Sequence, residues 1–161
     1  MNFTFAPITE SHAEQIVTWR YDPPYDLYNA SSTDLSAEIQ AILDPINNYF
    51  ALLNGDDLIG FRCFGSDARV AGGSYNDDAL DMGGGLRPDL TGQGRGRAVL
   101  EAGLAWGRTR FDPPAFRVTV AAFNQRALRM CQSAGFLVTQ QFERSVDQRR
   151  FLVLVRNERG A

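Results

Sequence analysis

The fold is decided by the stretch Leu86-Arg87-Pro88-Asp89-Leu90-Thr91-Gly92-Gln93-Gly94-Arg95-Gly96-Arg97-Ala98-Val99-Leu100. An apolar, extended lead-in ends at a proline, three glycines alternate with polar residues, and an amphipathic helix follows at once. Glycine lets the backbone approach a ligand closely and adopt conformations that are closed to other residues. A helix start offers unpaired N–H donors and the positive end of the dipole, which suit a phosphate. The stretch therefore predicts an anion-binding turn between a strand and a helix.

Two common phosphate-binding loops do not fit this stretch. A Walker loop ends in Gly-Lys followed by Ser or Thr, whereas Gly96 is followed by Arg97 and Ala98. A dinucleotide fingerprint needs its third glycine where Arg97 stands. A glycine-rich turn with no ligand is the other alternative. It is disfavoured, because three glycines before a helix lower stability without a compensating role.

The loop resembles the acyl-CoA pyrophosphate loop of the GNAT superfamily of N-acetyltransferases. That motif reads Arg or Gln, two residues, Gly, one residue, then Gly or Ala, and its positions fall on Thr91, Gly94 and Gly96. Thr91 departs from the family's long polar side chain. Because backbone donors do most of the pyrophosphate binding in such loops, this departure weakens the resemblance only slightly.

A second match lies downstream, between Asn124 and Phe136. It resembles the family's Asn-x-x-Ala helix, which is closed by a Gly-Phe that starts the next strand. Asn124 is a good N-cap and Gly135 a good C-terminal stop for a helix. An ordinary capped helix fits this segment when it is taken alone, but the two motifs in family order make coincidence improbable.

The composition is ordinary for a soluble globular protein, with 161 residues, 44% hydrophobic and 22% charged residues. We therefore expect one domain over residues 1–161. The net charge of −3 and the lack of any basic run argue against nucleic-acid binding. No apolar stretch has membrane-spanning length and the N-terminus carries no secretion signal, so we expect a cytoplasmic protein with no membrane partner.

Cysteine and histidine usage argues against a metal site. Cys63 and Cys131 have no metal-type spacing and suggest no disulfide framework. His12 is the single histidine, which excludes multi-histidine zinc sites and makes a Ser-His-Asp or Cys-His hydrolase improbable. We expect a surface role for His12 and no metal cofactor.

The hydrophobic pattern and the turn signals predict one α/β (α+β) domain. The expected strands are 3–5, 49–53, 58–64, 79–86, 116–122, 136–144 and 149–156, and the expected helices begin near 9, 34, 94 and 124. The resemblance implies a mixed, mostly antiparallel sheet of about seven strands flanked by about four helices. Two parallel strands, ending near Leu86 and starting at Phe116, should splay apart around acyl-CoA. Gly83-Gly84-Gly85 is consistent with a bulge there, or with an irregular strand that has no function.

The resemblance implies acetyl-CoA as the acyl donor. Met82 and the Gly84–Arg87 backbone should line its pantetheine arm, the Thr91–Gly96 loop with Arg97 should hold its pyrophosphate, and Asn124 should bond its pantetheine or diphosphate region. The predicted donor-binding residues are Met82, Gly84, Gly85, Leu86, Arg87, Thr91, Gly92, Gln93, Gly94, Arg95, Gly96, Arg97 and Asn124.

Acetyl transfer to an amine needs a base for the amine proton and a proton for the leaving thiolate. Asp81, in the strand before the loop, is the predicted base, because family members often place a carboxylate there. Asp77 and Asp78 are weaker candidates. The alternative is that Asp81 is an exposed carboxylate without a function. The family's acid is commonly a tyrosine on the helix after Asn124, and that position holds Cys131. A thiol, with an ordinary pKa of about 8.5, is a possible acid, although a buried structural cysteine is the stronger interpretation.

The acceptor pocket is expected from the segment Trp19-Arg20-Tyr21-Asp22-Pro23-Pro24-Tyr25-Asp26-Leu27-Tyr28-Asn29. It resembles a pattern in one bacterial branch of the family whose substrates are mostly unassigned. Aromatic faces and carboxylates suit an amine, but the aromatics fit a plug at the domain's edge equally well. The predicted substrate-binding residues are Trp19, Tyr21, Tyr25, Tyr28 and, on the opposite wall, Phe64. Phe61, Cys63 and the loop 65–69 are further candidates for that wall.

The sequence thus predicts an N-acetyltransferase that moves an acetyl group from acetyl-CoA to a primary amine of a small molecule or peptide. We expect direct transfer in a ternary complex, since no activated nucleophile is evident. The alternative is a CoA-binding module of the same fold without turnover; an O-acyltransferase or longer-chain acyltransferase is a weaker possibility. The hydrophobic C-terminal strand pair is suited to a homodimer.

Overall fold

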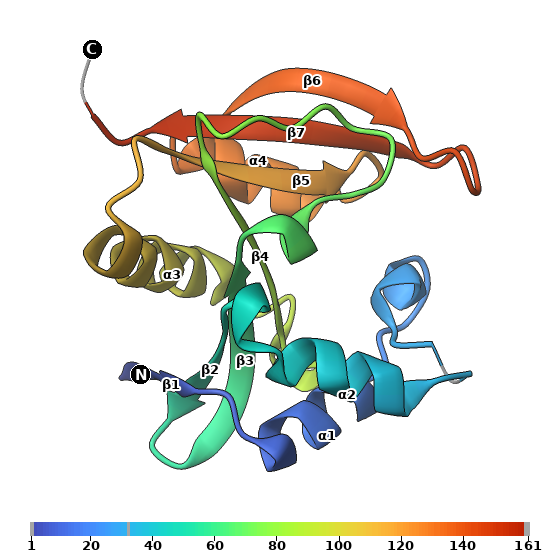
Figure 1. Ribbon diagram of the computed structural model, residues 1–161, viewed down its shortest axis with the longest axis vertical. Coiled ribbons are helices and arrows are strands. Elements are labelled where there is room, and N and C mark those ends of the chain that lie inside the picture. Colours follow the sequence, from blue (N-terminus) through green and yellow to red (C-terminus); the bar gives the residue numbers. More distant parts are fainter. Residues whose placement is uncertain (1, 32, 160–161) are drawn as a thin grey trace. The chain divides into compact units, whose positions relative to one another are not determined.

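The computed structural model describes residues 2–31 and 33–159 (Figure 1). The contacts divide the chain into two compact units. The N-terminal unit comprises Met1–Cys63 and Gly84–Gly96, and the C-terminal unit comprises Phe64–Gly83 and Arg97–Ala161. The single domain expected from the sequence stays a prediction.

Four helices and seven strands make up the regular structure of the described residues. The helices are α1 Glu10–Thr18, α2 Leu35–Leu43, α3 Gly96–Phe111 and α4 Gln125–Ser133. The strands are β1 Phe3–Pro7, β2 Tyr49–Asn54, β3 Asp57–Phe64, β4 Leu80–Leu86, β5 Ala115–Ala121, β6 Leu137–Glu143 and β7 Arg150–Asn157. Hydrogen bonding orders them β1-β2-β3-β4-β5-β7-β6, with β4 and β5 parallel and the β1–β2, β2–β3, β5–β7 and β6–β7 pairs antiparallel. This confirms the predicted mixed, mostly antiparallel α/β fold.

Local capping fixes the two helices of the N-terminal unit. The Thr9 hydroxyl accepts from the His12 backbone N–H at 3.1 Å, and the His12 ring Nδ1 accepts from the Thr9 N–H at 3.1 Å, which forms a capping box for α1. Asp34 caps α2 by accepting from the N–H of Ala37 at 3.0 Å. His12 therefore has a structural role at the start of α1. The buried faces of the two helices pack together through Ala13, Val17 and Ile42.

The second half of β4 lies against β3 in the N-terminal unit, and Gly84 makes this approach possible. Gly84 has φ +154°, in the region that side chains disfavour. A Cβ at Gly84 would collide with the carbonyl oxygen of Phe61 and the guanidinium of Arg62. At the triple glycine, β4 thus lies unusually close to the neighbouring strand β3.

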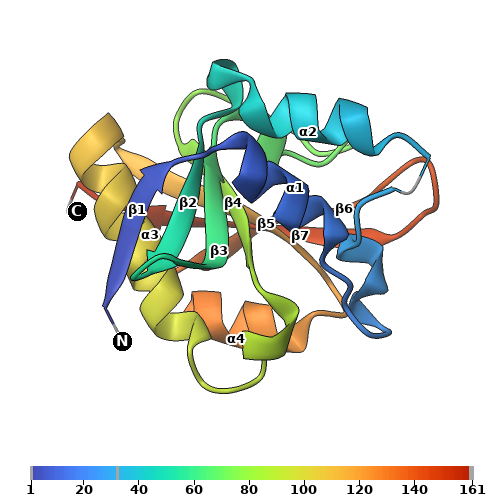
Figure 2. The same cartoon turned by 90° about the horizontal axis from the view of Figure 1, so that it is seen from below.

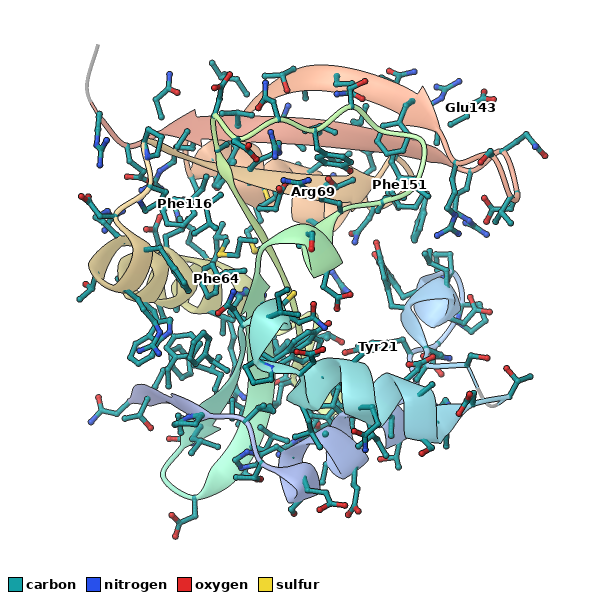
Figure 3. All side chains as sticks on the ribbon, in the orientation of Figure 1. Tyr21, Phe64, Arg69, Phe116, Glu143 and Phe151 are labelled. Carbon is teal, nitrogen blue, oxygen red and sulfur yellow. The ribbon has the colours of Figure 1, made fainter. Side chains whose placement is uncertain are left out.

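In the C-terminal unit, β5, β7 and β6 form an antiparallel set covered on both faces. Figures 1 and 2 show α4 on one face and residues 65–79, between β3 and β4, on the other. The core is aromatic: Phe64 and Phe116 are fully buried, and both rings press on Gly107 of α3, where a Cβ would come within 3.0 Å of each ring (Figure 3). Phe111 at the end of α3 packs on Phe64 with the ring centroids 5.2 Å apart.

Helix α3 begins at Gly96, two residues later than expected. Gly92 and Gly94 have φ +71° and +75°, so neither belongs to a right-handed helix. A 3₁₀ turn over Tyr25–Tyr28 also forms within the segment expected to be a loop. The other helices and strands begin and end within about two residues of the predicted bounds, as is usual for helix and strand ends.

The glycine requirement at β4 predicts a difference between two substitutions. Gly84→Ala should lower the free energy of unfolding by about 2–4 kcal/mol, because backbone strain and overpacking add. Gly55→Ala in the β2–β3 turn is the matched control: its φ is +61°, but its Cβ would meet no heavy atom of the described residues within 4 Å. Strain alone should then cost about 1–2 kcal/mol. Urea denaturation measures both, and equal losses would contradict the close packing at Gly84.

Candidate active site

The glycine-rich loop is held in place by the polar side chains between its glycines. The Thr91 hydroxyl donates to the Pro88 carbonyl at 2.7 Å, which closes the 3₁₀ turn Pro88–Leu90. The Gln93 amide donates to the Asp89 carbonyl at 2.6 Å. The Thr91 side chain thus stabilises the conformation of the loop.

The backbone of this loop suits an anion. Gly92 and Gly94 have positive φ and alternate with other residues, and loops in which left-handed residues alternate with others are a common type of anion-binding turn. Gly96 then begins the 16-residue helix α3, whose first-turn N–H groups and dipole favour negative charge. A Cβ at Gly94 would meet no described heavy atom within 4 Å. The predicted residues Thr91, Gly92, Gln93, Gly94, Arg95 and Gly96 therefore form a loop that fits a pyrophosphate.

The arginines around the loop have different surroundings. The Arg87 guanidinium donates to Asp57 at 2.9 Å, to Asp89 at 2.7 Å and to the Leu58 carbonyl at 2.9 Å. The hydrogen bonds to the two carboxylates raise the pKa of Arg87. Its side chain thus stabilises the β3–β4 region, and only its backbone remains suited to the pantetheine contact expected of it.

Arg97 connects the first turn of α3 with the end of α4. Its guanidinium donates to Glu101 on the same helix at 3.0 Å and to the Ser133 hydroxyl at 3.0 Å. Arg97 is half exposed, so a phosphate has access to it beside these partners. Arg95, two residues earlier and just before α3, is partly exposed.

The remaining predicted donor-binding residues lie on β4. Met82 is 4% exposed and belongs to the core. Gly85 and Leu86 lie in the half of the strand that belongs to the N-terminal unit, and a Cβ at Gly85 would come within 3.0 Å of the Phe61 ring and 3.3 Å of the Tyr21 hydroxyl. At the start of β4, Leu80 pairs with Phe116 and Asp81 with Arg117 of β5.

The helix after Asn124 has the predicted local structure. The Asn124 side-chain oxygen accepts from the Ala127 N–H at 3.1 Å, which caps α4. Gly135 has φ +94°, as a helix stop requires, and Phe136 after it is fully buried. Cys131 is 4% exposed on the buried face of α4. This burial favours a structural role for its thiol.

Asp81 occupies a different environment from the one expected for a base. It is 2% exposed, and both carboxylate oxygens accept hydrogen bonds from arginines: from Arg117 Nε and Nη2 at 2.7 Å each and from Arg69 Nε at 2.9 Å. The hydrogen bonds that Arg117 donates to Asp81 raise the pKa of Arg117. Arg69 and Arg117 also lie over the ring of Tyr75, at 5.4 and 5.1 Å from its centroid.

These contacts give Asp81 a structural role that the sequence prediction did not include. Both carboxylate oxygens are already occupied by arginine donors and the side chain is 2% exposed, so an amine has no access to this carboxylate. Its partners fix the segment 65–79, since Arg69 and Tyr75 both lie in that segment. We therefore do not assign proton removal to Asp81.

The predicted acceptor residues divide between surface and core. Trp19, Tyr21 and Tyr25 are partly exposed and Tyr28 is 43% exposed, so four of the five are accessible in the N-terminal unit. Phe64 is fully buried in the aromatic core of the C-terminal unit, which argues against a substrate contact there (Figure 3). Strand alternation alone did not show which face of β3 is covered.

Phe61, another candidate for the opposite wall, is partly exposed in the N-terminal unit. Phe61 of β3 lies between Trp19, at 6.2 Å between ring centroids, and Tyr49, stacked at 5.8 Å. Tyr21 and Phe61 thus lie next to Gly85, and Trp19 and Tyr49 pack on Phe61. We call these four aromatic side chains the aromatic wall.

The family model of the acetyltransferase (GNAT) family matches residues 13–136, more than half of the chain. The chain therefore belongs to this family, which confirms the predicted family. Its reaction class is that of an acyl-CoA-dependent N-acetyltransferase. No curated protein sequence matches it.

Solved structures with the same fold include enzymes that act on amines. A chimera of spermidine N-acetyltransferase SpeG from Vibrio cholerae and hSSAT is 15% identical, with 96% of this chain and 95% of that chain covered and a TM-score of 0.73. Aminoglycoside acetyltransferase AAC(6')-Ib is 15% identical in its complex with ribostamycin and coenzyme A, with 98% and 94% covered and a TM-score of 0.75. The complex of the same enzyme with paromomycin and acetyl-CoA is 13% identical to this chain, with 98% of this chain and 94% of that chain covered and a TM-score of 0.77. At this identity the likeness establishes the fold alone.

Within residues 2–31 and 33–159, no helix has the length and hydropathy needed to cross a membrane. The same residues hold no group of three or more His, Cys, Asp or Glu side chains placed to bind a metal ion.

The buried ion pair predicts a large effect of Asp81→Asn on stability. Removing the charge leaves two guanidinium groups without their carboxylate, one of them on the 5% exposed Arg117, and should cost about 3–5 kcal/mol in the free energy of unfolding. Asp147→Asn is the matched control, because Asp147 also contacts two arginines, Arg144 at 2.6 Å and Arg149 at 3.7 Å, but in an exposed hairpin. Asp147→Asn should lower the free energy of unfolding much less than Asp81→Asn does. Urea denaturation at neutral pH compares the two, and similar losses would contradict the structural role of Asp81.

Proposed function

We propose that this protein transfers the acetyl group of acetyl-CoA to a primary amine of a small molecule that carries a second positive charge. The family assignment supports the reaction, and the glycine-rich loop at the start of α3 is the observation that supports the donor. The solved structures of similar fold include enzymes named for spermidine and aminoglycosides, both of which carry several amines. Cytoplasmic location and a homodimer remain parts of this proposal.

The distribution of charge along the chain supports a cationic acceptor. The N-terminal unit has ten Asp and Glu against four Arg, a net charge of −6, and the C-terminal unit has nine Asp and Glu against twelve Arg, a net charge of +3. Asp22 and Asp26, both exposed, lie in the same segment as Tyr21. An acidic surface attracts and orients a polyamine, and aromatic faces bind ammonium groups by cation–π interaction.

On the donor side, the chain's own groups have three tasks. The backbone N–H groups of the loop and of the first turn of α3 would hold the pyrophosphate, with Arg95 and Arg97 adding positive charge. The glycine-rich half of β4 would lie along the pantetheine arm. Its backbone N–H groups would polarise the thioester carbonyl as negative charge develops on that oxygen.

On the acceptor side, the amine must be neutral when it attacks. Because Asp81 is held by two arginines and Cys131 is buried, we propose that water carries the amine proton away and that the thiolate leaves without a protein acid. His12 caps α1, so no described histidine is placed to activate a cysteine, and direct transfer in a ternary complex follows. Rate then depends on positioning and on the backbone donors.

One observation favours the second candidate, a CoA-binding domain without turnover. Cys131, at the position where the family commonly has its tyrosine acid, is 4% exposed. Such a protein would bind acetyl-CoA and release no thiol on addition of any amine. The two candidates therefore make opposite predictions in one assay.

The assay follows thiol release from acetyl-CoA with spermidine, ribostamycin and propylamine as acceptors. We expect turnover with the first two and little with propylamine, which has one amine. The chain contains no lysine, so acetylated amine detected by mass spectrometry cannot arise on lysine side chains of the protein itself. Tight acetyl-CoA binding without thiol release would establish the binding domain instead. Preference for propylamine would remove the cationic acceptor from the proposal.

Two substitutions at Gly94 test the donor site. Gly94→Glu and Gly94→Ala introduce the same backbone strain, since φ is +75° and both Cβ atoms point into space where no described heavy atom lies within 4 Å. The carboxylate of Glu would repel the phosphates, so Gly94→Glu should bind acetyl-CoA at least about tenfold more weakly than Gly94→Ala, a difference of about 1.4 kcal/mol. Calorimetric titration measures both dissociation constants. Equal affinities of the two variants would show that the pyrophosphate does not bind at this loop.

A further inference from the structure

Tyr21 joins the end of the α1 region to the last residue of β4. Its hydroxyl donates to the Leu86 carbonyl at 2.7 Å, across 65 positions of sequence and within the N-terminal unit. Burial raises the pKa of Tyr21 to about 12. The phenol therefore stays protonated at neutral pH and keeps its donor role on a backbone carbonyl, which is a positioning function rather than an acid–base function.

Asn29 closes the same segment from its other end. The Tyr21 N–H donates to the Asn29 side-chain oxygen at 2.7 Å, and the Asn29 amide donates back to the Tyr21 carbonyl at 3.4 Å. The Tyr25–Tyr28 turn lies between these two residues. One residue thus anchors the whole segment 21–29 to β4, because Tyr21 bonds both to Asn29 and to Leu86.

The anchor also fixes the aromatic wall. The Tyr21 hydroxyl and the Phe61 ring are the side-chain atoms nearest to a Cβ built on Gly85, at 3.3 and 3.0 Å. Phe61 in turn packs on Trp19 and Tyr49. The wall therefore stands directly against the part of β4 along which the pantetheine arm is proposed to lie.

We infer that Tyr21 is a positioning residue for the acceptor: by bonding the Leu86 carbonyl it holds the aromatic wall and the acidic segment 21–29 beside β4, and so sets where the amine stands. This inference rests on the proposed function, since it takes β4 as the donor strand. The wall takes the non-reacting, positively charged end of the acceptor on its aromatic faces. The reacting amine is then brought to the thioester by geometry alone.

The test compares Tyr21→Phe with Thr139→Val, a control that removes a hydroxyl-to-carbonyl hydrogen bond outside the proposed site, from Thr139 to the Val153 carbonyl at 3.3 Å. Tyr21→Phe keeps the ring and removes the hydrogen bond to Leu86. The KM for spermidine should rise about 3- to 10-fold, while kcat and the dissociation constant of acetyl-CoA stay within about twofold. Thr139→Val should leave all three values unchanged. Melting temperatures of both variants exclude unfolding as the cause.

Asn29→Ala provides a second variant that acts on the same segment through a different bond. It should raise the KM for spermidine as Tyr21→Phe does, and the double variant should show less than the product of the two effects, because both release one segment. A fall in kcat with unchanged KM would overturn the inference by placing Tyr21 in the chemistry. Equal weakening of spermidine and acetyl-CoA would overturn it by showing a general structural effect.

Binding of spermidine to the wild-type protein in the presence of CoA separates this inference from the proposed function. If spermidine binds without thiol release, the proposed function fails, and a weaker calorimetric affinity of Tyr21→Phe still supports the positioning role. If spermidine turns over but Tyr21→Phe equals the wild type in KM, the function stands and the inference is wrong.

Discussion

The pairing of the Asp81 carboxylate with Arg117 is the interaction on which the C-terminal unit depends most. Two hydrogen bonds of 2.7 Å join a 2% exposed carboxylate to a 5% exposed guanidinium on the neighbouring parallel strand, at the register pair where β4 meets β5. A buried charge is costly unless it is fully paired, so this bond is strongly favoured in the folded state. Arg69 and Tyr75 add the segment 65–79 to the same cluster. A residue in the position of a base thus serves as an anchor.

The other half of β4 is shaped by packing rather than charge. Gly84 lets β3 approach, Gly85 lets the aromatic wall approach, and the Leu86 carbonyl receives the Tyr21 hydroxyl. If water carries the amine proton, then the placement of the amine and the backbone donors must supply most of the rate enhancement. An enzyme of this kind gains specificity from the residues that hold its acceptor segment, and Tyr21 is the residue that makes the long-range bond.

Local signals predicted most of the fold. Asp34 and Asn124 cap helices as expected, Gly135 ends α4, and the polar and apolar alternation gave all seven strands. Long-range pairs were not predictable, because a hydrogen bond between positions 21 and 86 or 81 and 117 leaves no periodic trace in one sequence. Phe61 and Phe64 show the same limit: both are aromatic residues of β3, and only the tertiary packing decides that the first is accessible and the second is core.

The central claim is that the backbone of the glycine-rich loop holds the acyl donor. Hydrogen–deuterium exchange of the wild-type protein with and without acetyl-CoA tests it directly, because N–H groups that bind phosphate oxygens exchange more slowly. We predict slower exchange over residues 92–98 on addition of acetyl-CoA. Unchanged exchange in that segment, at an acetyl-CoA concentration where calorimetry shows saturation, would contradict the account.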